Sequence, residues 1–370
     1  MPIFKNRQGN ELDMYKPTSA TALLLLKGAA AALCLMAATQ AATAADAEPV
    51  EYVRVCDAYG NGFFYVPGTE TCLKISGYLR HEVAAGDDVY WGGSLDGLPG
   101  KARATLRFDA RNETEFGTLR SYLETRFEHK ASGERIYISE ALIELAGFSV
   151  GIADSLFANW TWGAGNVIYD DVIYYSGDRT MQASYTHDFG NGFSAMVGAE
   201  EGNGSWELEA VDASGVASRE WFDLRADSIP HLLGGVKYEA DRMTLFGMAA
   251  YDTRYDAWAF KARVNLDVTD TLSLFVMAAY QSDPSRPNYY GSWYGDWAMW
   301  GGASVKVSEK ATINSQIDFE EDGTWNAALN VAYEIAPGFK ITPELDYTAF
   351  RGFRGHEDAF GGVVRFQRNF

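Results

Sequence analysis

From residue 73 to the C-terminus, apolar and polar residues alternate along segments of roughly ten residues. In residues 340–348 the odd positions are Ile341, Pro343, Leu345 and Tyr347, and the even positions are Lys340, Thr342, Glu344, Asp346 and Thr348. The same period of two recurs in residues 257–268, 311–319 and 324–335. A period of two is that of a β-strand with one apolar and one polar face. Sixteen such segments can be counted, so the sequence predicts an all-β protein with sixteen strands.

The connections between these segments alternate between short turns and longer polar stretches. Short ones include 146–147, 269–270 and 337–338, and long ones include 85–100, 155–179, 200–230 and 282–296. Short turns at one rim and long loops at the other are typical of an antiparallel transmembrane β-barrel with periplasmic turns and extracellular loops. Lipid offers no partner for an unpaired backbone group, so such a sheet must close on itself. The alternative is a soluble sandwich, whose apolar face would need a second sheet.

An apolar, Ala- and Leu-rich segment lies near the N-terminus, from about Ser19 to Ala45. Lys16 precedes it, and it ends in the small residues Ala42-Thr43-Ala44. This pattern predicts a secretory signal peptide over residues 1–44, with Met1 or Met14 as the start. The alternative is an uncleaved membrane anchor. Beyond this segment no run of 18 apolar residues remains, so no transmembrane helix is expected.

Charge and motifs restrict the function. The formal net charge is -19, which argues against a nucleic-acid partner because phosphate binding needs clustered Lys and Arg. We expect the acids to lie in loops and in a lumen. No GxSxG, HExxH, P-loop or GxGxxG motif lies in the strand–helix context that its chemistry needs. The His residues are scattered, and no zinc-type spacing is present. The sequence therefore predicts neither an enzyme, nor a metal site, nor a cofactor.

Two cysteines remain after the signal peptide. Cys34 would leave with it, whereas Cys56 and Cys72 stay in the chain. An even number of cysteines in an exported protein suggests a disulfide. The expectation is a Cys56–Cys72 disulfide within an N-terminal segment, residues 45–72, ahead of a barrel over residues 73–370. Two free thiols are the alternative.

A barrel of sixteen strands is too wide for its own side chains to fill, so a constriction requires an inserted segment. The candidate is residues 155–179, after the fifth strand, which contain Trp160 and Trp162. Glycines in this stretch permit a tight bend. Its acidic residues are the expected constriction acids: Asp170, Asp171 and Asp178.

Basic residues alternate along the first three predicted strands. In residues 101–108, Lys101, Arg103 and Arg107 share one face, and Ala, Leu and Phe occupy the other. A charged residue facing lipid at mid-depth would cost about 2–4 kcal/mol, so these bases are expected to face the lumen. The predicted basic ladder is Arg80, Arg103, Arg107, Arg120 and Arg126. Facing the acidic loop, it would create a transverse field. Alternatively, these charges hydrate the lumen and pair with Glu82, Glu124 or Glu128.

Three stretches resemble a known family. They are the opening from Val53 to Leu73 (VRVCDAYGNGFFYVPGTETCL), the following Ser76–Arg80 and Gly86–Tyr90, and the end from Gly361 to Phe370 (GGVVRFQRNF). These stretches resemble the outer-membrane general porins of alphaproteobacteria, the rhizobial and Brucella type. Arg368 stands where that family usually has an apolar residue.

The resemblance implies a sixteen-stranded, homotrimeric diffusion porin of the outer membrane, in contact with membrane lipid and lipopolysaccharide, with an inward-folded third loop. The function expected is therefore a water-filled passive channel for small hydrophilic solutes and ions. The alternatives are a substrate-specific outer-membrane channel on the same barrel and a surface adhesin or structural barrel. Net charge favours cations, but the basic ladder could offset it, so ion preference stays open.

Overall fold

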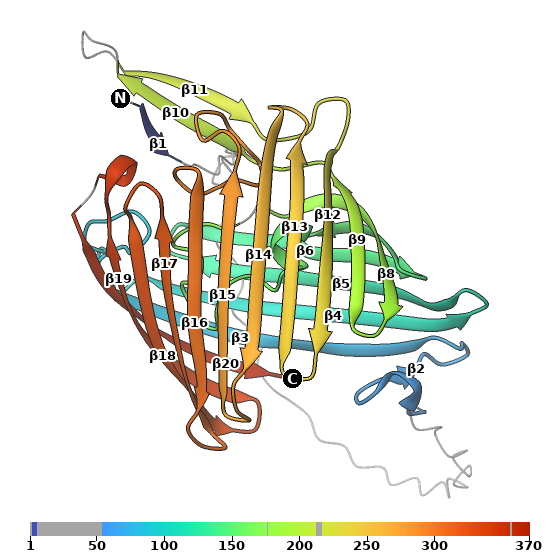
Figure 1. Cartoon of the computed structure of the whole chain (residues 1–370). Helices are drawn as coiled ribbons and strands as arrows, with labels where there is room; N and C mark the ends of the chain where they lie inside the picture. The colour runs from blue at the N-terminus through green and yellow to red at the C-terminus, as the bar shows by residue number, and fades with distance from the viewer. Residues whose placement is uncertain (1, 6–53, 176, 212–216, 356) are drawn as a thin grey trace, which may run out of the picture.

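The computed structural model describes residues 2–5, 54–175, 177–211, 217–355 and 357–370. Its strands form one closed antiparallel barrel, in which β20 pairs with β3 and so joins the two ends of the sheet (Figure 1). Sixteen long strands make up the wall, as predicted. Their bounds are β3 (Cys72–Gly86), β4 (Gly100–Thr114), β5 (Gly117–Lys130), β6 (Gly133–Leu145), β7 (Phe148–Ala153), β8 (Thr180–Gly190), β9 (Phe193–Glu200), β12 (His231–Ala240), β13 (Met243–Asp252), β14 (Ala257–Asp267), β15 (Leu272–Gln281), β16 (Trp297–Lys306), β17 (Ala311–Glu320), β18 (Trp325–Ala336), β19 (Phe339–Ala349) and β20 (Ala359–Asn369).

Smaller elements lie outside this wall. The two-residue β2 (Phe64–Tyr65) pairs with the start of β3, and η1 (Asp57–Tyr59) precedes it. In the long connection from β9 to β12, β10 (Ser205–Val211) and β11 (Ala217–Asp223) form a hairpin that extends beyond the barrel end at the top of Figure 1. β1 (Pro2–Lys5) pairs with β10. The signal peptide is predicted over residues 1–44. Apart from residues 2–5 this range lies outside the described residues, so the signal peptide stays a prediction.

The two ends of the barrel differ in their connections. At one end, tight turns such as 146–147, 191–192 and 337–338 join neighbouring strands. Gly147 has φ +88, and a Cβ there would lie 2.4 Å from the Thr186 carbonyl oxygen, so this turn requires glycine. The opposite end carries the long segments 87–99, 154–179, 201–230 and 282–296. Three connections at that end, 131–132, 253–256 and 321–324, are also short.

Burial is inverted relative to a soluble protein. Leu329 and Leu345 face each other across β18 and β19 and are 52% and 57% exposed. The next pair along the same strands, Asn330 and Glu344, is only 1% and 2% exposed. Apolar side chains therefore point outward and polar ones inward, which suits a sheet with hydrocarbon outside. Among the described residues, none of the helices is long and apolar enough to cross a membrane.

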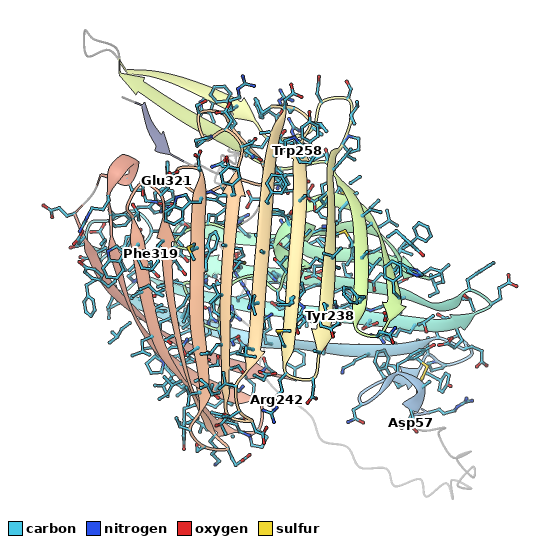
Figure 2. The ribbon with its side chains drawn as sticks, viewed as in Figure 1. Asp57, Tyr238, Arg242, Trp258, Phe319 and Glu321 are labelled. Atoms are coloured by element: carbon cyan, nitrogen blue, oxygen red, sulfur yellow. A yellow bond between two sulfur atoms is a disulfide. The ribbon has the colours of Figure 1, made fainter. Side chains whose placement is uncertain are left out.

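The N-terminal segment is tied to the barrel by the expected disulfide. Cys56 and Cys72 are bonded, with their Cα atoms 6.0 Å apart, and the bond lies beside the labelled Asp57 in Figure 2. Both half-cystines are buried with Phe63. The Arg111 guanidinium lies 5.0 Å from the centroid of the Phe63 ring, so β4 also holds this segment.

The inverted burial predicts different effects for the two faces of one strand. Leu345→Arg would place a charge in hydrocarbon near the middle of β19, so the free energy of unfolding in lipid should fall by about 2–4 kcal/mol. Thr342→Arg, on the lumen side of the same strand, should change it much less. Urea titration of the protein folded in lipid vesicles measures both, and an equal loss for the two variants would contradict the assigned faces.

Candidate functional site

The candidate site is the inner loop, residues 155–179, which joins β7 to β8. It opens with the single helical turn α1 (Leu156–Asn159), whose first residues bind Glu200 at the end of β9. The Ser155 hydroxyl donates to Glu200 over 2.9 Å, and the Leu156 amide donates over 2.6 Å. Because Glu200 is fully buried, these bonds fix where the loop leaves the wall.

Two cations on β14 bind the loop in its first half and near its end. The Lys261 ammonium donates to the carbonyls of Phe157 (2.7 Å) and Tyr175 (2.5 Å), and Arg263 donates to those of Gly163 and Ala164. Lys261 also lies 4.1 Å from the centroid of the Phe157 ring. Buried charges normally need a partner. Here the partners are main-chain carbonyls, so the loop backbone is bound whatever its side chains are.

Polar side chains of β17 to β19 bind the middle of the loop. Gln316 accepts from the Gly165 amide (2.6 Å) and donates to the Asp170 carbonyl (2.9 Å). Glu344 accepts from the amides of Ile168 (2.5 Å) and Tyr169 (2.9 Å). These groups come from the buried polar face whose alternation the sequence displays.

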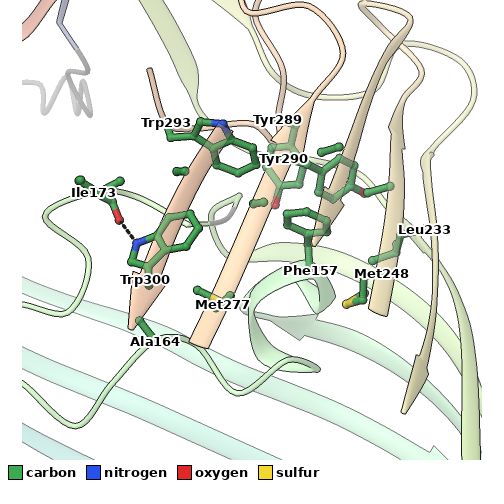
Figure 3. Close-up of a cluster of buried hydrophobic side chains, with 14 of the residues drawn as sticks. Phe157, Ala164, Ile173, Leu233, Met248, Met277, Tyr289, Tyr290, Trp293 and Trp300 are labelled. Carbon is green, nitrogen blue, oxygen red and sulfur yellow. Dashed lines mark hydrogen bonds between the residues drawn. The ribbon is translucent and has the colours of Figure 1, made fainter. Parts of the chain in front are cut away.

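An apolar cluster completes the attachment. Phe157 and Ile173 of the loop pack against Tyr289, Tyr290 and Trp300 (Figure 3). The indole of Trp300 also donates to the Ile173 carbonyl over 2.9 Å, the dashed line in that figure. The loop therefore lies against the wall of β9 and β12 to β19 and leaves the β3 to β6 wall uncovered by these contacts.

The three predicted loop acids each accept a tyrosine hydroxyl. Asp170 binds Tyr175 (2.9 Å), Asp171 binds Tyr90 of the 87–99 connection (2.6 Å), and Asp178 binds Tyr174 (2.6 Å). Burial raises the pKa of Asp170 to about 7, and the neighbouring Asp171 carboxylate adds to the shift.

The Asp171 carboxyl is influenced by groups on the β3–β4 side of the barrel. Burial raises its pKa, the Tyr90 hydroxyl opposes that shift, and Lys101 at the start of β4 opposes it further. The Asp171 carboxyl therefore lies towards the long-loop end of the β3 to β6 wall, beside the 87–99 connection.

The predicted basic ladder lies on adjoining strands, and each member has an acidic partner. Arg103 binds Glu128 over 2.7 Å. Arg107 and Arg126 share Glu124, at 2.6 and 2.7 Å. Arg120 lies between Asp109 (3.1 Å) and Glu144 (2.6 Å). Arg80 donates to Gln367 and lies 3.8 Å from Glu82. The bases therefore lie together on one wall and are paired there. The alternative in the sequence analysis, that these arginines pair with Glu82, Glu124 or Glu128, describes these contacts.

Several groups at the site are not singled out by the sequence. Lys261 and Arg263 hold the loop, yet in the sequence they are two polar positions of an ordinary alternating strand. Glu82 binds Lys101 (2.5 Å) and Arg365 (2.6 Å), which joins three strands. In the described part of the chain, no group of three or more His, Cys, Asp or Glu residues is placed to hold a metal ion.

Comparison with known proteins agrees with this geometry. A model of the Porin subfamily matches residues 40–362. The chain is 42% identical to porin Omp2b of Brucella suis and 41% identical to porin Omp2a of Brucella melitensis biotype 1, each over 94% of this chain and 99% of the relative. This chain belongs to the Porin subfamily. It is therefore an outer-membrane β-barrel, as the alphaproteobacterial resemblance implied.

Solved structures resemble this porin in fold. The outer-membrane channel DcaP of Acinetobacter baumannii superposes with a TM-score of 0.64 at 16% identity, over 83% of this chain and 99% of that one. OmpF of Salmonella typhi gives 0.56 at 10% identity, over 81% and 98%. At such low identities the likeness extends to the barrel alone.

The buried cation on β14 gives a direct test of how the inner loop is held in this porin. Lys261→Met keeps the length of the side chain but removes the ammonium donor from the Tyr175 and Phe157 carbonyls, of which Phe157 keeps only the Thr161 hydroxyl; an unpaired buried carbonyl costs about 1–3 kcal/mol. We expect a lower thermal unfolding temperature and larger fluctuations of single-channel current as the loop loosens. Lys306→Met, which alters a lysine exposed at a short turn, is the control. If Lys261→Met changed neither the unfolding temperature nor the current fluctuations, this lysine would not hold the loop.

Proposed function

We propose that this porin forms a water-filled channel across the outer membrane through which small hydrophilic solutes and ions pass by passive diffusion, without enzymatic activity. The observation that carries the proposal is the one-sided attachment of the inner loop. Most loop contacts are with the wall from β9 round to β19. On the other side Arg179 lies against Tyr137 of β6 and Asp171 against Tyr90, so the arginines of β3 to β5 face the loop. Such an arrangement narrows a barrel without filling it.

The constriction proposed here lies between two charged surfaces. Asp170, Asp171 and Asp178 belong to the loop surface, and Arg80, Arg103, Arg107, Arg120 and Arg126 to the wall. Because every ladder arginine has a carboxylate or amide partner, the wall contributes local dipoles more than net positive charge. The loop acids then determine the sign of the preference, and we expect cations to be favoured at neutral pH and above.

Conductance measurements test the channel and the loop acids together. Purified protein in planar bilayers should give ohmic current, and its reversal potential in a salt gradient should indicate cation preference at pH 8. A carboxyl group with a pKa of about 7 is charged above that pH and neutral below it, so the preference should fall between pH 8 and pH 5. Asp170→Asn should remove most of this change.

Glu113→Gln is the matched control, because Glu113 is an exposed carboxylate at the short-turn end of β4, bonded to Tyr59 and Thr118 and remote from the inner loop. Its reversal potential should keep the pH dependence of the parent. Absence of current from folded protein would exclude a diffusion channel and favour an adhesin or structural barrel.

We further propose that the outer face of β3 to β6 contacts other copies of the chain in a homotrimer, with lipid and lipopolysaccharide around the remaining faces. On this face His81 and His129 flank Ala102 in one row, where lipid would disfavour polar side chains. A groove beside them is lined by Leu79, Ala104, Phe127 and Ile136 among others. The outer face of β14 to β17 instead carries Trp258, Tyr280, Trp297 and Phe319 towards the long loops, the aromatic pattern expected against lipid.

The trimer face can be tested with a bulky apolar residue that lipid itself tolerates. Ala104→Trp would fill the groove and should convert the oligomer band on unheated gels to monomer, while the barrel stays folded. Ala262→Trp, on the outer face of β14, should leave the oligomer intact. An unaffected oligomer in Ala104→Trp would place the interface elsewhere.

A further inference from the structure

One large aromatic side chain of the inner loop stays half exposed although it touches the wall. Trp162 follows α1 and is 54% exposed. Its ring lies edge-on to Phe246, with centroids 4.9 Å apart, and Phe246 is buried on the inner face of β13. The next carbonyl, that of Gly163, binds Arg263 on the inner face of β14. Trp162 is therefore exposed to the lumen and not to the surrounding lipid.

The backbone at Trp162 is in a conformation that bulky residues rarely adopt. Its φ is +67, in the left-handed region. The other non-glycine residues with positive φ among the described residues are Ala146, Asn191 and Asp256, which all lie in hairpin turns. The Trp162 amide donates to the Asn159 carbonyl (3.1 Å) and the Gly163 amide to the Ala158 carbonyl (3.0 Å), so Trp162 occupies the left-handed position of the turn that ends α1. That position is usually glycine, and a tryptophan there bears a steric cost while half of its side chain stays exposed.

Two basic residues flank Phe246, on which the indole of Trp162 packs. Lys237 on β12 and Arg263 on β14 are the two cross-strand neighbours of Phe246. The Lys237 ammonium lies 2.9 Å from Glu239, and Arg263 donates to the side-chain oxygen of Asn265 over 2.8 Å. The region thus offers hydrogen-bond donors and acceptors, with the charge of Lys237 compensated.

We propose that Trp162, supported by Phe246 and bordered by the Lys237–Glu239 pair, is a subsite that binds neutral pyranose sugars as they pass through the lumen. The C–H groups on one face of a pyranose ring carry partial positive charge and stack on the negative face of an indole. The hydroxyls round its edge suit a paired ammonium and carboxylate. Because Lys237 is paired with Glu239, and Arg263 is buried with its donors bound to Asn265 and loop carbonyls, neither cation is free to select a charged solute.

The subsite has a defined place along the channel. Phe246 is three residues from the start of β13, which follows the short 241–242 turn. Trp162 therefore lies on the short-turn side of the inner loop, so a sugar would meet it after the acidic stretch when entering from the long-loop side. This inference rests on the proposed diffusion channel and names one class of solute within it.

The test is the block of single-channel current by maltose, compared with a polyethylene glycol of similar size. Maltose should lower the current with saturation, whereas the polymer should lower it in proportion to its concentration. Trp162→Gly, which also suits the positive φ, should raise the half-saturating maltose concentration by about tenfold, the size expected for one lost stacking contact. Trp162→Phe should recover part of that loss.

Trp91→Gly, which removes an exposed tryptophan of the 87–99 connection, is the matched control and should bind maltose as the parent does. Currents are normalised to each variant's own sugar-free value, so a change in open conductance does not affect the comparison.

Block by maltose that does not saturate, or an unchanged half-saturating concentration in Trp162→Gly, would overturn the subsite while leaving the channel itself in place. Tighter saturable block by benzoate than by maltose would overturn the assignment to sugars. A lack of sugar-free current would instead overturn the proposed function.

Discussion

The fold depends on the requirement that every backbone hydrogen bond be made within the sheet. Lipid cannot supply a donor or an acceptor, so an open edge at bilayer depth would leave a row of unpaired groups. The pairing of β20 with β3, from Gly361 against Gly86 to Asn369 against Tyr78, removes that edge. Once the sheet is closed, the period of two assigns each side chain to lipid or lumen, and the polar face becomes the inner wall.

A polar inner wall makes a stable inner loop possible. A segment folded into a barrel brings carbonyls and amides with it, and these must be satisfied where water is partly excluded. The wall meets this need group by group, through Glu200 at the start of the loop, Gln316 and Glu344 along the middle, and Lys261 and Arg263 in the first half and near the end. Because these contacts come from strands spread around half of the barrel, no single one defines the position of the loop. The constriction is therefore a fixed part of the wall more than a flap on a hinge.

The sequence predicts the features that repeat and misses those that depend on pairing between distant strands. Alternation along single segments is local, so the number of strands, the two faces and the position of the inner loop can be read from it. Which acid meets which base is decided by register between strands. The sequence places Arg107 and Arg126 on the lumen face, but only the alignment of β4 with β5 makes them share Glu124. For the same reason Lys261 cannot be distinguished from any other polar residue of β14 before the loop is folded against it. Nor does the sequence show that Phe157 and Ile173, and not the larger Trp162, occupy the buried positions of the loop.

Pairing within the lumen also changes what the net charge of the chain implies. A charge of -19 suggests a strongly negative pore, yet the arginines of β3 to β5 and their carboxylates largely cancel. Several of the remaining acids are exposed at the short turns, among them Asp188, Asp241 and Glu309.

Charges at a rim attract counter-ions to the mouth but are screened within roughly 8 Å at physiological salt. Inside, where the walls are of low dielectric, a few uncompensated groups have a larger effect than many screened ones. The loop acids, held by tyrosine hydroxyls instead of by bases, are such groups. Selectivity should therefore depend on the protonation of a small number of loop residues and only weakly on the total charge.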